Sequence, residues 1–322
     1  MHRRTLLLAS LATPALAQPA MAQPAPWPTR PIRFVVPFAP GGPVEPPARF
    51  IAAHLAERLG QPVTVDLKPG AAGSIGVRDV VHSTDAHSFL FFTNGLPIIP
   101  ALQANPGFDL FTDLKPITLI ADNPMCLVVK ADSPVQSLPD MLARAKAAPG
   151  TISYGSSGVG SITHLAWLLL QDKSGTEFLH VPYRGAGQAI NAVYTGEIQI
   201  YIGDLGLLLP HVRDGRIRLL GVTSSQRLPM LPETPALSET LSGGYSLPIY
   251  YCLLGPAATP DAHVQRLLAE IAPLRTQGPL AERVAAGGGT MLLDGPGPLA
   301  ARMQVETPLW RNVLGRAGIK PE

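Results

Sequence analysis

Charged and aromatic residues are scarce in this chain. Of its 322 residues only 15% are charged and 6% are aromatic, and the formal net charge is +2. A nucleic-acid-binding surface needs a basic stripe, commonly interleaved with aromatic side chains, and the sequence contains no such stripe. We therefore expect no nucleic-acid partner.

Cysteine is almost absent as well. The chain has two cysteines, Cys126 and Cys252, each inside an apolar β-like run. Their wide separation excludes a cysteine cluster that would bind a metal, and we expect no metal site. In an oxidising compartment they could form a disulfide if their strands are neighbours, or remain two separate buried thiols. The sequence leaves both possibilities open.

Motifs for catalysis and for cofactor binding are missing. No G-x-S-x-G motif surrounds the serines between 153 and 161, there is no Walker A motif, and the glycines at 158–160 lack the third member of a dinucleotide fingerprint. Ser161, His164 and Asp204 could still meet as a catalytic set in three dimensions. The sequence nevertheless favours a protein that is not an enzyme and that needs no cofactor.

The longest apolar stretch near the N-terminus, residues 6–16, is too short to span a bilayer. It follows a basic segment with Arg3 and Arg4, and small residues allow cleavage after Ala17 or after Ala22. We therefore expect residues 1–22 to be a signal peptide and the mature protein to be periplasmic, with a membrane anchor as the alternative. The arginine pair leaves general secretion and twin-arginine export both open.

Glycine and proline are abundant, with 31 and 35 residues, and three glycine-rich turns stand between a β-like run and a helix-like run. These turns lie at residues 37–45, 68–76 and 153–164. A strand that turns through glycine into a helix leaves free N–H groups and the positive end of the helix dipole facing one point, which suits an anion. The turns therefore predict two lobes that share a ligand the size of a carboxylate.

Strand-like and helix-like segments alternate from residue 32 onward. Strands are expected at 32–38, 63–65, 89–93, 151–154, 178–183, 198–202 and 219–222, and helices at 46–59, 73–81, 138–147, 162–171, 188–194, 263–274 and 298–314. This alternation predicts an α/β fold with parallel sheets covered on both faces. The runs around the two cysteines bracket the middle third of the chain. We therefore expect lobe 1 at residues 28–124 plus 250–322, lobe 2 at 125–249, and the ligand between them.

Two acidic residues are candidates for the ligand site. Glu45 stands at a helix start, where the dipole favours a carboxylate, so it either caps the helix or faces the ligand. Asp204 follows a strand, and ligands of α/β sheets bind beyond the carboxyl ends of the strands. Both residues are therefore included among the candidates.

Hydroxyl and imidazole side chains gather at the third turn. His164 either packs locally or donates a hydrogen bond to a carboxylate, and Ser161 is a candidate N-cap. Ser156 and Ser157 are then better candidates for free hydroxyls facing the ligand. The complete candidate set for ligand binding is Phe38, Ala39, Gly41, Gly42, Glu45, Ala71, Gly73, Ser156, Ser157, Gly158, Ser161, His164 and Asp204.

Taken in order along the chain, these motifs resemble the Bug (TctC-like) family of extracytoplasmic solute receptors of tripartite tricarboxylate transport systems. The matching segments include Val36-Pro37-Phe38-Ala39 with Gly41-Gly42, Pro69-Gly70-Ala71, Tyr154-Gly155-Ser156-Ser157-Gly158, Val181-Pro182-Tyr183-Arg184-Gly185 and Ala317-Gly318-Ile319. The resemblance implies a two-lobed periplasmic binding protein of type II topology. A small organic acid would be held by backbone amides and bridging waters of the first two turns, with the third turn at its far end.

The resemblance also implies the partners. The receptor would deliver its ligand to a permease made of a large and a small integral membrane subunit, and we expect it to be a monomer without a cofactor. Glu45 stands where the family usually has Asp, and Pro46 and Pro47 replace aliphatic residues. Because of these departures, the ligand preference of the family does not carry over directly. An extracytoplasmic sensor on the same fold and a hydrolase-like enzyme remain alternative functions.

Overall fold

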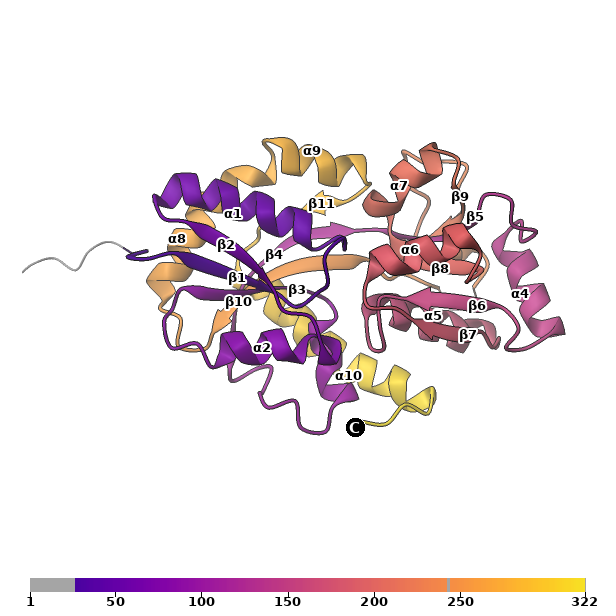
Figure 1. Ribbon diagram of the computed structural model, residues 1–322, viewed down its shortest axis with the longest axis horizontal. Coiled ribbons are helices and arrows are strands. Elements are labelled where there is room, and N and C mark those ends of the chain that lie inside the picture. The colour runs from indigo at the N-terminus through magenta and orange to yellow at the C-terminus, as the bar shows by residue number, and fades with distance from the viewer. Residues whose placement is uncertain (1–26, 242–243, 322) are drawn as a thin grey trace, which may run out of the picture.

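The computed structural model describes residues 27–241 and 244–321, and the predicted signal peptide lies outside the described residues. Two mixed sheets, each with helices on both faces, form two lobes that lie side by side (Figure 1). The α/β class predicted from the sequence is confirmed. In the ranges that the structure describes, no helix is both long enough and apolar enough to cross a membrane.

The first sheet has six strands in the order β11-β4-β10-β3-β1-β2, and the second has five in the order β7-β6-β8-β5-β9. The strands of the first sheet are β1 (Ile32–Val36), β2 (Val63–Leu67), β3 (Ser88–Thr93), β4 (Leu114–Asn123), β10 (Ile249–Pro256) and β11 (Thr290–Met291). Those of the second are β5 (Met125–Lys130), β6 (Ser153–Ser156), β7 (Leu179–Pro182), β8 (Ile200–Asp204) and β9 (Ile217–Val222).

The prediction of parallel sheets is only partly right. β1 pairs in parallel with β2 and β3, and β6 with β7 and β8, but β5 and β10 run antiparallel to both of their neighbours. These two strands are the ones by which the chain enters each sheet from the other lobe. β4 ends at Asn123 and β5 starts at Met125, so the chain crosses directly between the lobes without a covering helix. The residue limits of the lobes, 28–124 plus 250–322 and 125–249, stay a prediction.

Helices cover both faces of each sheet because the strands are apolar on both faces. In β1, Phe34 and Val36 pack in the cluster that contains Ile51 of α1, whereas Val35 packs in the cluster that contains Val77 of α2. The first lobe carries α1 (Glu45–Leu59), α2 (Ser74–Val81), α3 (Ile99–Leu102), α8 (Asp261–Ile271), α9 (Pro279–Ala286) and α10 (Pro296–Arg316). The second carries α4 (Leu138–Ala147), α5 (Ile162–Ser174), α6 (Ala186–Thr195) and α7 (Leu205–Arg213).

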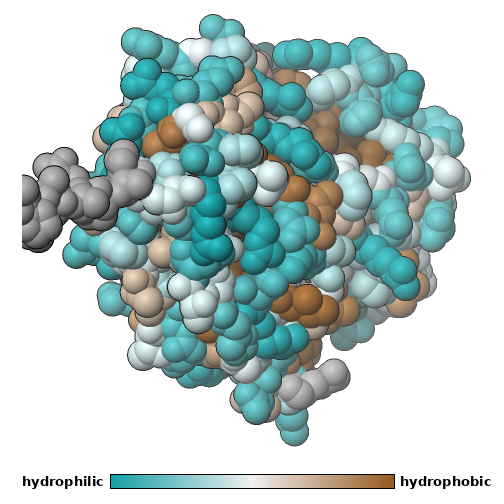
Figure 2. Space-filling view, turned by 60° about the vertical axis from the view of Figure 1, so that its left-hand side comes forward, coloured by the Kyte–Doolittle hydropathy of each residue, from teal (hydrophilic) through white to brown (hydrophobic). Residues whose placement is uncertain are grey.

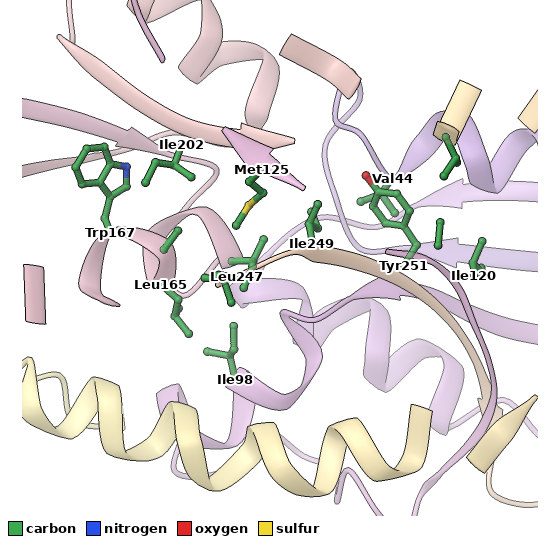
Figure 3. Packing of buried hydrophobic residues seen from close by; sticks show 14 of the residues in the cluster. Val44, Ile98, Ile120, Met125, Leu165, Trp167, Ile202, Leu247, Ile249 and Tyr251 are labelled. Carbon is green, nitrogen blue, oxygen red and sulfur yellow. The ribbon is translucent and has the colours of Figure 1, made fainter. Parts of the chain in front are cut away.

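One apolar cluster extends through both lobes. Met125, Leu247 and Ile249 lie between the side chains around Trp167 in the second lobe and those around Tyr251 in the first (Figure 3). The outer surface, in contrast, is mostly hydrophilic in the view of Figure 2, with smaller hydrophobic patches. The core therefore joins the lobes at the crossing strands.

The two cysteines are buried and free, and they lie in different sheets. Cys126 is in β5 and Cys252 is in β10, so their strands are not neighbours. Of the two alternatives left open by the sequence, the structure has the separate buried thiols.

Candidate functional site

A cavity of about 560 Å³ lies between the two lobes. Its walls are mainly glycine, proline, hydroxyl and aromatic residues, and among residues 27–241 and 244–321 the charged residues that line it are Arg184 and Asp204. The first lobe contributes residues 37–39, 42–44, 69–70, 72–73, 92–93 and 95, and the second contributes 157–163, 183–186, 201 and 204, together with residue 249 from β10.

The structure brings most of the predicted ligand-binding residues to this cavity. Those that line it are Phe38, Ala39, Gly42, Gly73, Ser157, Gly158, Ser161 and Asp204. Those that do not line it are Gly41, Glu45, Ala71, Ser156 and His164. The second group lies within the three turns, and several of its members contact the backbone of those turns.

Glu45 closes its own turn. One carboxylate oxygen accepts a hydrogen bond from the Gly41 N–H at 3.3 Å, and the other accepts one from Arg49 Nε at 2.7 Å. Pro46 and Pro47 have no N–H, so the first turn of α1 has few donors to offer an anion. In the structure Glu45 thus bonds within its own turn and does not line the cavity.

The second turn has an unusual backbone. Gly70, Ala71, Ala72 and Gly73 all have positive φ, at 132°, 46°, 53° and 96°. A left-handed alanine costs roughly 1 kcal/mol, so the neighbouring structure must hold this loop in place. Gln103 contributes by donating from Nε2 to the Ala71 carbonyl at 2.9 Å. The loop presents Ala72 and Gly73 to the cavity, directly before the N-terminus of α2.

The third turn is held by its own hydroxyl groups. Ser161 is the N-cap of α5, as predicted: its Oγ accepts from the His164 N–H at 3.3 Å and donates to the Gly158 carbonyl at 2.7 Å. The expectation that Ser156 has a free hydroxyl is wrong, because Ser156 is fully buried and its Oγ lies 2.7 Å from His180 Nε2. Ser157 does reach the cavity, where its Oγ lies 3.3 Å from the Tyr201 hydroxyl.

His164 does not reach the cavity as a donor. Its side chain is buried, its Nδ1 accepts a hydrogen bond from the Gly160 N–H at 3.2 Å, and its ring stacks on His180. Burial lowers the pKa of His164 to about 3, with a further contribution from His180, and burial lowers the pKa of His180 to about 4. Both rings are therefore neutral near pH 7.

Asp204 lies at the cavity wall, but both of its carboxylate oxygens are occupied. It is the N-cap of α7, accepting from the Leu207 N–H at 2.9 Å, and its other oxygen accepts from the Tyr251 hydroxyl at 2.8 Å and from Asn123 Nδ2 at 3.1 Å. Burial raises the pKa of Asp204 above its usual range, against the effect of these hydrogen bonds. The residue thereby joins β8 of the second lobe to β4 and β10 of the first.

The same contacts show how Ser161, His164 and Asp204, which the sequence allowed as a catalytic set, are arranged. Ser161 Oγ meets the backbone N–H of His164 and not its ring, and Asp204 makes its hydrogen bonds to other residues. No nucleophile–base–acid relay forms among these three residues.

Arg184 was missed as a site residue. It is exposed at the cavity, and within residues 27–241 and 244–321 no carboxylate forms an ion pair with its guanidinium. It precedes Gly185 and the N-terminus of α6, in a fourth strand–glycine–helix turn that also lines the cavity. The signal was present in the sequence as Val181–Gly185 followed by a helix, the same pattern that marked the other three turns.

The N-termini of α2, α5 and α6 thus lie with the Arg184 guanidinium, which has no ion-pair partner in the described part of the chain, at a cavity between two α/β lobes. This fold and this site define a ligand-binding protein of the periplasmic binding protein class. The tripartite tricarboxylate transporter family receptor profile, TctC, matches residues 47–288. The chain belongs to this family, and the resemblance seen in the sequence is confirmed.

Solved structures agree with the assignment of fold. The chain is similar to the periplasmic binding protein BugD, at 29% identity and a TM-score of 0.85 over 92% of this chain and 100% of the other. It is similar to Rpa4515 of R. palustris with adipate, at 30% identity and a TM-score of 0.86 over 92% and 100%. It is also similar to MatC of Rhodopseudomonas palustris with bound malate, at 26% identity and a TM-score of 0.83 over 89% and 100%.

Proposed function

We propose that this protein is a periplasmic receptor that captures a small organic carboxylate between its lobes and delivers it to a tripartite membrane transporter. In this proposal residues 1–22 direct export, the mature chain acts as a monomer, and no catalytic step occurs. The family membership and the adipate and malate named for two similar proteins support the choice of ligand class.

The observation that carries the proposal is the charge balance of the cavity. The residues at the N-termini of α2, α5 and α6 line it, so the positive dipole ends of three helices lie at its wall. The one carboxylate in its wall, Asp204, is already satisfied by Leu207, Tyr251 and Asn123. An anionic ligand therefore meets donors without meeting an unpaired negative charge.

Arg184 adds a charged contact in the second lobe, and we propose that it selects for a second carboxylate on the ligand. A guanidinium and a carboxylate form strong, charge-assisted hydrogen bonds, worth more than those between neutral groups. The amides of the 70–73 loop and of α2 would take the first carboxylate in the other lobe. A dicarboxylate would then bind more tightly than a monocarboxylate of the same length.

A thermal-shift screen with adipate, malate and hexanoate tests both parts of this proposal. A ligand at a hundred times its Kd adds about 2.7 kcal/mol to the free energy of unfolding, which gives a clear rise in Tm. We expect Arg184→Gln to weaken adipate binding by about tenfold or more and to leave hexanoate binding unchanged, because a charge-assisted hydrogen bond contributes roughly 1.5–3 kcal/mol.

Arg213→Gln is the matched control, since Arg213 is exposed at the end of α7 and does not line the cavity. It should bind adipate like the wild type. Equal loss of adipate and hexanoate in Arg184→Gln would contradict the role given to Arg184. Absence of a shift with every acid would contradict the carboxylate-receptor proposal itself.

A further inference from the structure

Five aromatic rings form a continuous column beneath the third turn. His164 stacks on His180 with ring centroids 4.1 Å apart and planes 7° apart, and His180 stacks on Tyr154 at 4.9 Å and 16°. Tyr154 in turn stacks on Trp167 at 4.6 Å, and Trp167 contacts Phe178 at 5.2 Å. The column connects the N-terminal turn of α5 with β6, β7 and the core of the second lobe.

The two imidazoles at the top of the column hold the backbone of the turn. His164 Nδ1 accepts from the Gly160 N–H at 3.2 Å. His180 Nε2 lies 2.7 Å from Ser156 Oγ, and that hydroxyl accepts from the Gly158 N–H at 3.2 Å. The Gly160 amide is therefore directed toward the buried ring of His164, and the Gly158 amide toward the Ser156 hydroxyl that contacts the half-buried His180.

This arrangement fixes the shape of the segment that faces the ligand. Gly158 and Gly160 have positive φ, at 128° and 76°, and so are held in conformations that favour glycine. Residues 157–161 all line the cavity, whereas neither histidine does. The rings can affect a ligand only through the backbone that they hold.

We propose that His164 and His180 are positioning residues, whose neutral, stacked rings hold the 157–161 turn in the geometry that receives the ligand. The proposal rests on the proposed function for the identity of the ligand site. Its structural part, the holding of the turn by the rings, stands on the contacts alone and can be tested without ligand.

The proposal specifically requires a hydrogen-bond acceptor at the position of His164 Nδ1, to bind the Gly160 N–H. A phenylalanine ring could occupy the stack on His180 but could not accept from the Gly160 N–H. A glutamine at the third position of a helix can reach back with its side-chain oxygen to a backbone N–H before the first turn, as in a capping box. His164→Phe therefore removes the hydrogen bond and keeps the ring, whereas His164→Gln removes the ring and keeps an acceptor.

Amide hydrogen exchange of the ligand-free protein is the first measurement. We expect the Gly160 amide to exchange about fivefold faster in His164→Phe, because a lost hydrogen bond is worth about 1 kcal/mol, and to recover partly in His164→Gln. His263→Phe is the control, because His263 stacks on Trp27 far along the chain from the turn. Unchanged exchange at residues 158–161 in His164→Phe would overturn the proposal.

Adipate affinity is the second measurement. His164→Phe should bind adipate about fivefold more weakly than the wild type, with binding partly restored in His164→Gln and unchanged in His263→Phe. If His164→Phe lowered Tm but left the adipate affinity unchanged, the ring would serve stability alone. That result would overturn the positioning role. If the wild type itself bound no acid, the carboxylate-receptor proposal would fail, while the exchange experiment would still decide whether the imidazole holds the turn.

Discussion

The polar side chains around the cavity act mainly on the protein's own backbone. Glu45 binds the Gly41 N–H, Ser161 caps α5, and Asp204 caps α7. Each of them satisfies donors that a turn or a helix end would otherwise leave unpaired. The helix N-termini and glycine turns are thereby preorganised, and under the proposed function the contact with the anion is left largely to backbone amides and to Arg184.

Glu45→Gln tests whether the Glu45 carboxylate binds the protein's own backbone instead of the ligand. The substitution removes the charge from the ion pair with Arg49, whose side chain is more than half exposed, and weakens the hydrogen bond to the Gly41 N–H. We expect the free energy of unfolding to fall by about 0.5–1 kcal/mol in urea titrations, since exposed ion pairs contribute little. Adipate affinity, measured by calorimetry, should stay within about twofold of the wild type. A tenfold change in affinity would instead place the carboxylate at the ligand.

At the scale of the element, the helices that begin with a clear cap and the buried strands could be predicted from the sequence. α4 has the predicted bounds, with Ser137 as its N-cap, and α5 begins at the predicted residue. β4 was missed because Pro116 interrupts its apolar run, and its place between β10 and β11 depends on pairing with distant residues. The antiparallel direction of β5 and β10 likewise follows from the crossing of the chain between the lobes. This crossing cannot be predicted from a local sequence pattern.

The same distinction explains the site. The glycine turns could be located from local sequence, because positive φ and helix starts have local signatures. The roles of Ser156, His164 and Asp204 could not, because these side chains also contact residues of other strands. Ser156 and His164 contact His180 of β7, and Asp204 contacts Asn123 of β4 and Tyr251 of β10. Asp204 was placed at the end of a strand correctly, but the helix that starts at Leu205 went unnoticed, and with it the capping role.

A buried carboxyl group in α10 is expected to make the free energy of unfolding depend on pH. Glu306 packs against β10, where it accepts from the Tyr250 hydroxyl at 2.7 Å, and burial raises its pKa to about 7 from an ordinary value of 4.5. Between pH 4.5 and 7 the folded state therefore holds a proton that the unfolded state releases. The stabilisation present below pH 4.5 is lost as the pH rises through this window, by up to about 1.4 kcal/mol per pH unit.

Glu306→Gln should remove this dependence, because glutamine can still accept from Tyr250 and never becomes charged. We expect the variant to be more stable than the wild type at pH 8 and similar to it at pH 4.5, in urea titrations at both values. The buried histidines act in the opposite direction below pH 6.5 in both proteins, so the comparison between variant and wild type isolates Glu306. Parallel stability curves for the two proteins would contradict the raised pKa.

At the scale of the whole molecule, the two lobes approach one another closely at the cavity. A Cβ atom at Gly187, in the first turn of α6, would lie 3.6 Å from the Gly41 carbonyl oxygen of the other lobe, and one at Gly185 would lie 3.5 Å from the Ala39 Cβ. These distances are ordinary van der Waals contacts, so a methyl group fits at Gly187 while a larger side chain would meet the first turn. We therefore expect any closure of the lobes around a ligand to depend on a small residue here.

Comparing Gly187→Ala with Gly187→Leu distinguishes an effect on the approach of the two lobes from an effect on folding. Gly187→Ala should raise the free energy of unfolding of the ligand-free protein by about 0.5–1 kcal/mol, because glycine is unfavourable in a helix. Adipate affinity should be unchanged in the alanine variant and at least tenfold weaker in the leucine variant, since leucine must separate the lobes before the ligand can be enclosed. Small-angle scattering with saturating adipate should then give a larger radius of gyration for Gly187→Leu than for Gly187→Ala. Equal affinity and equal compactness in both variants would mean that the lobes hold their ligand without closing at this edge, and that the cavity walls alone determine binding.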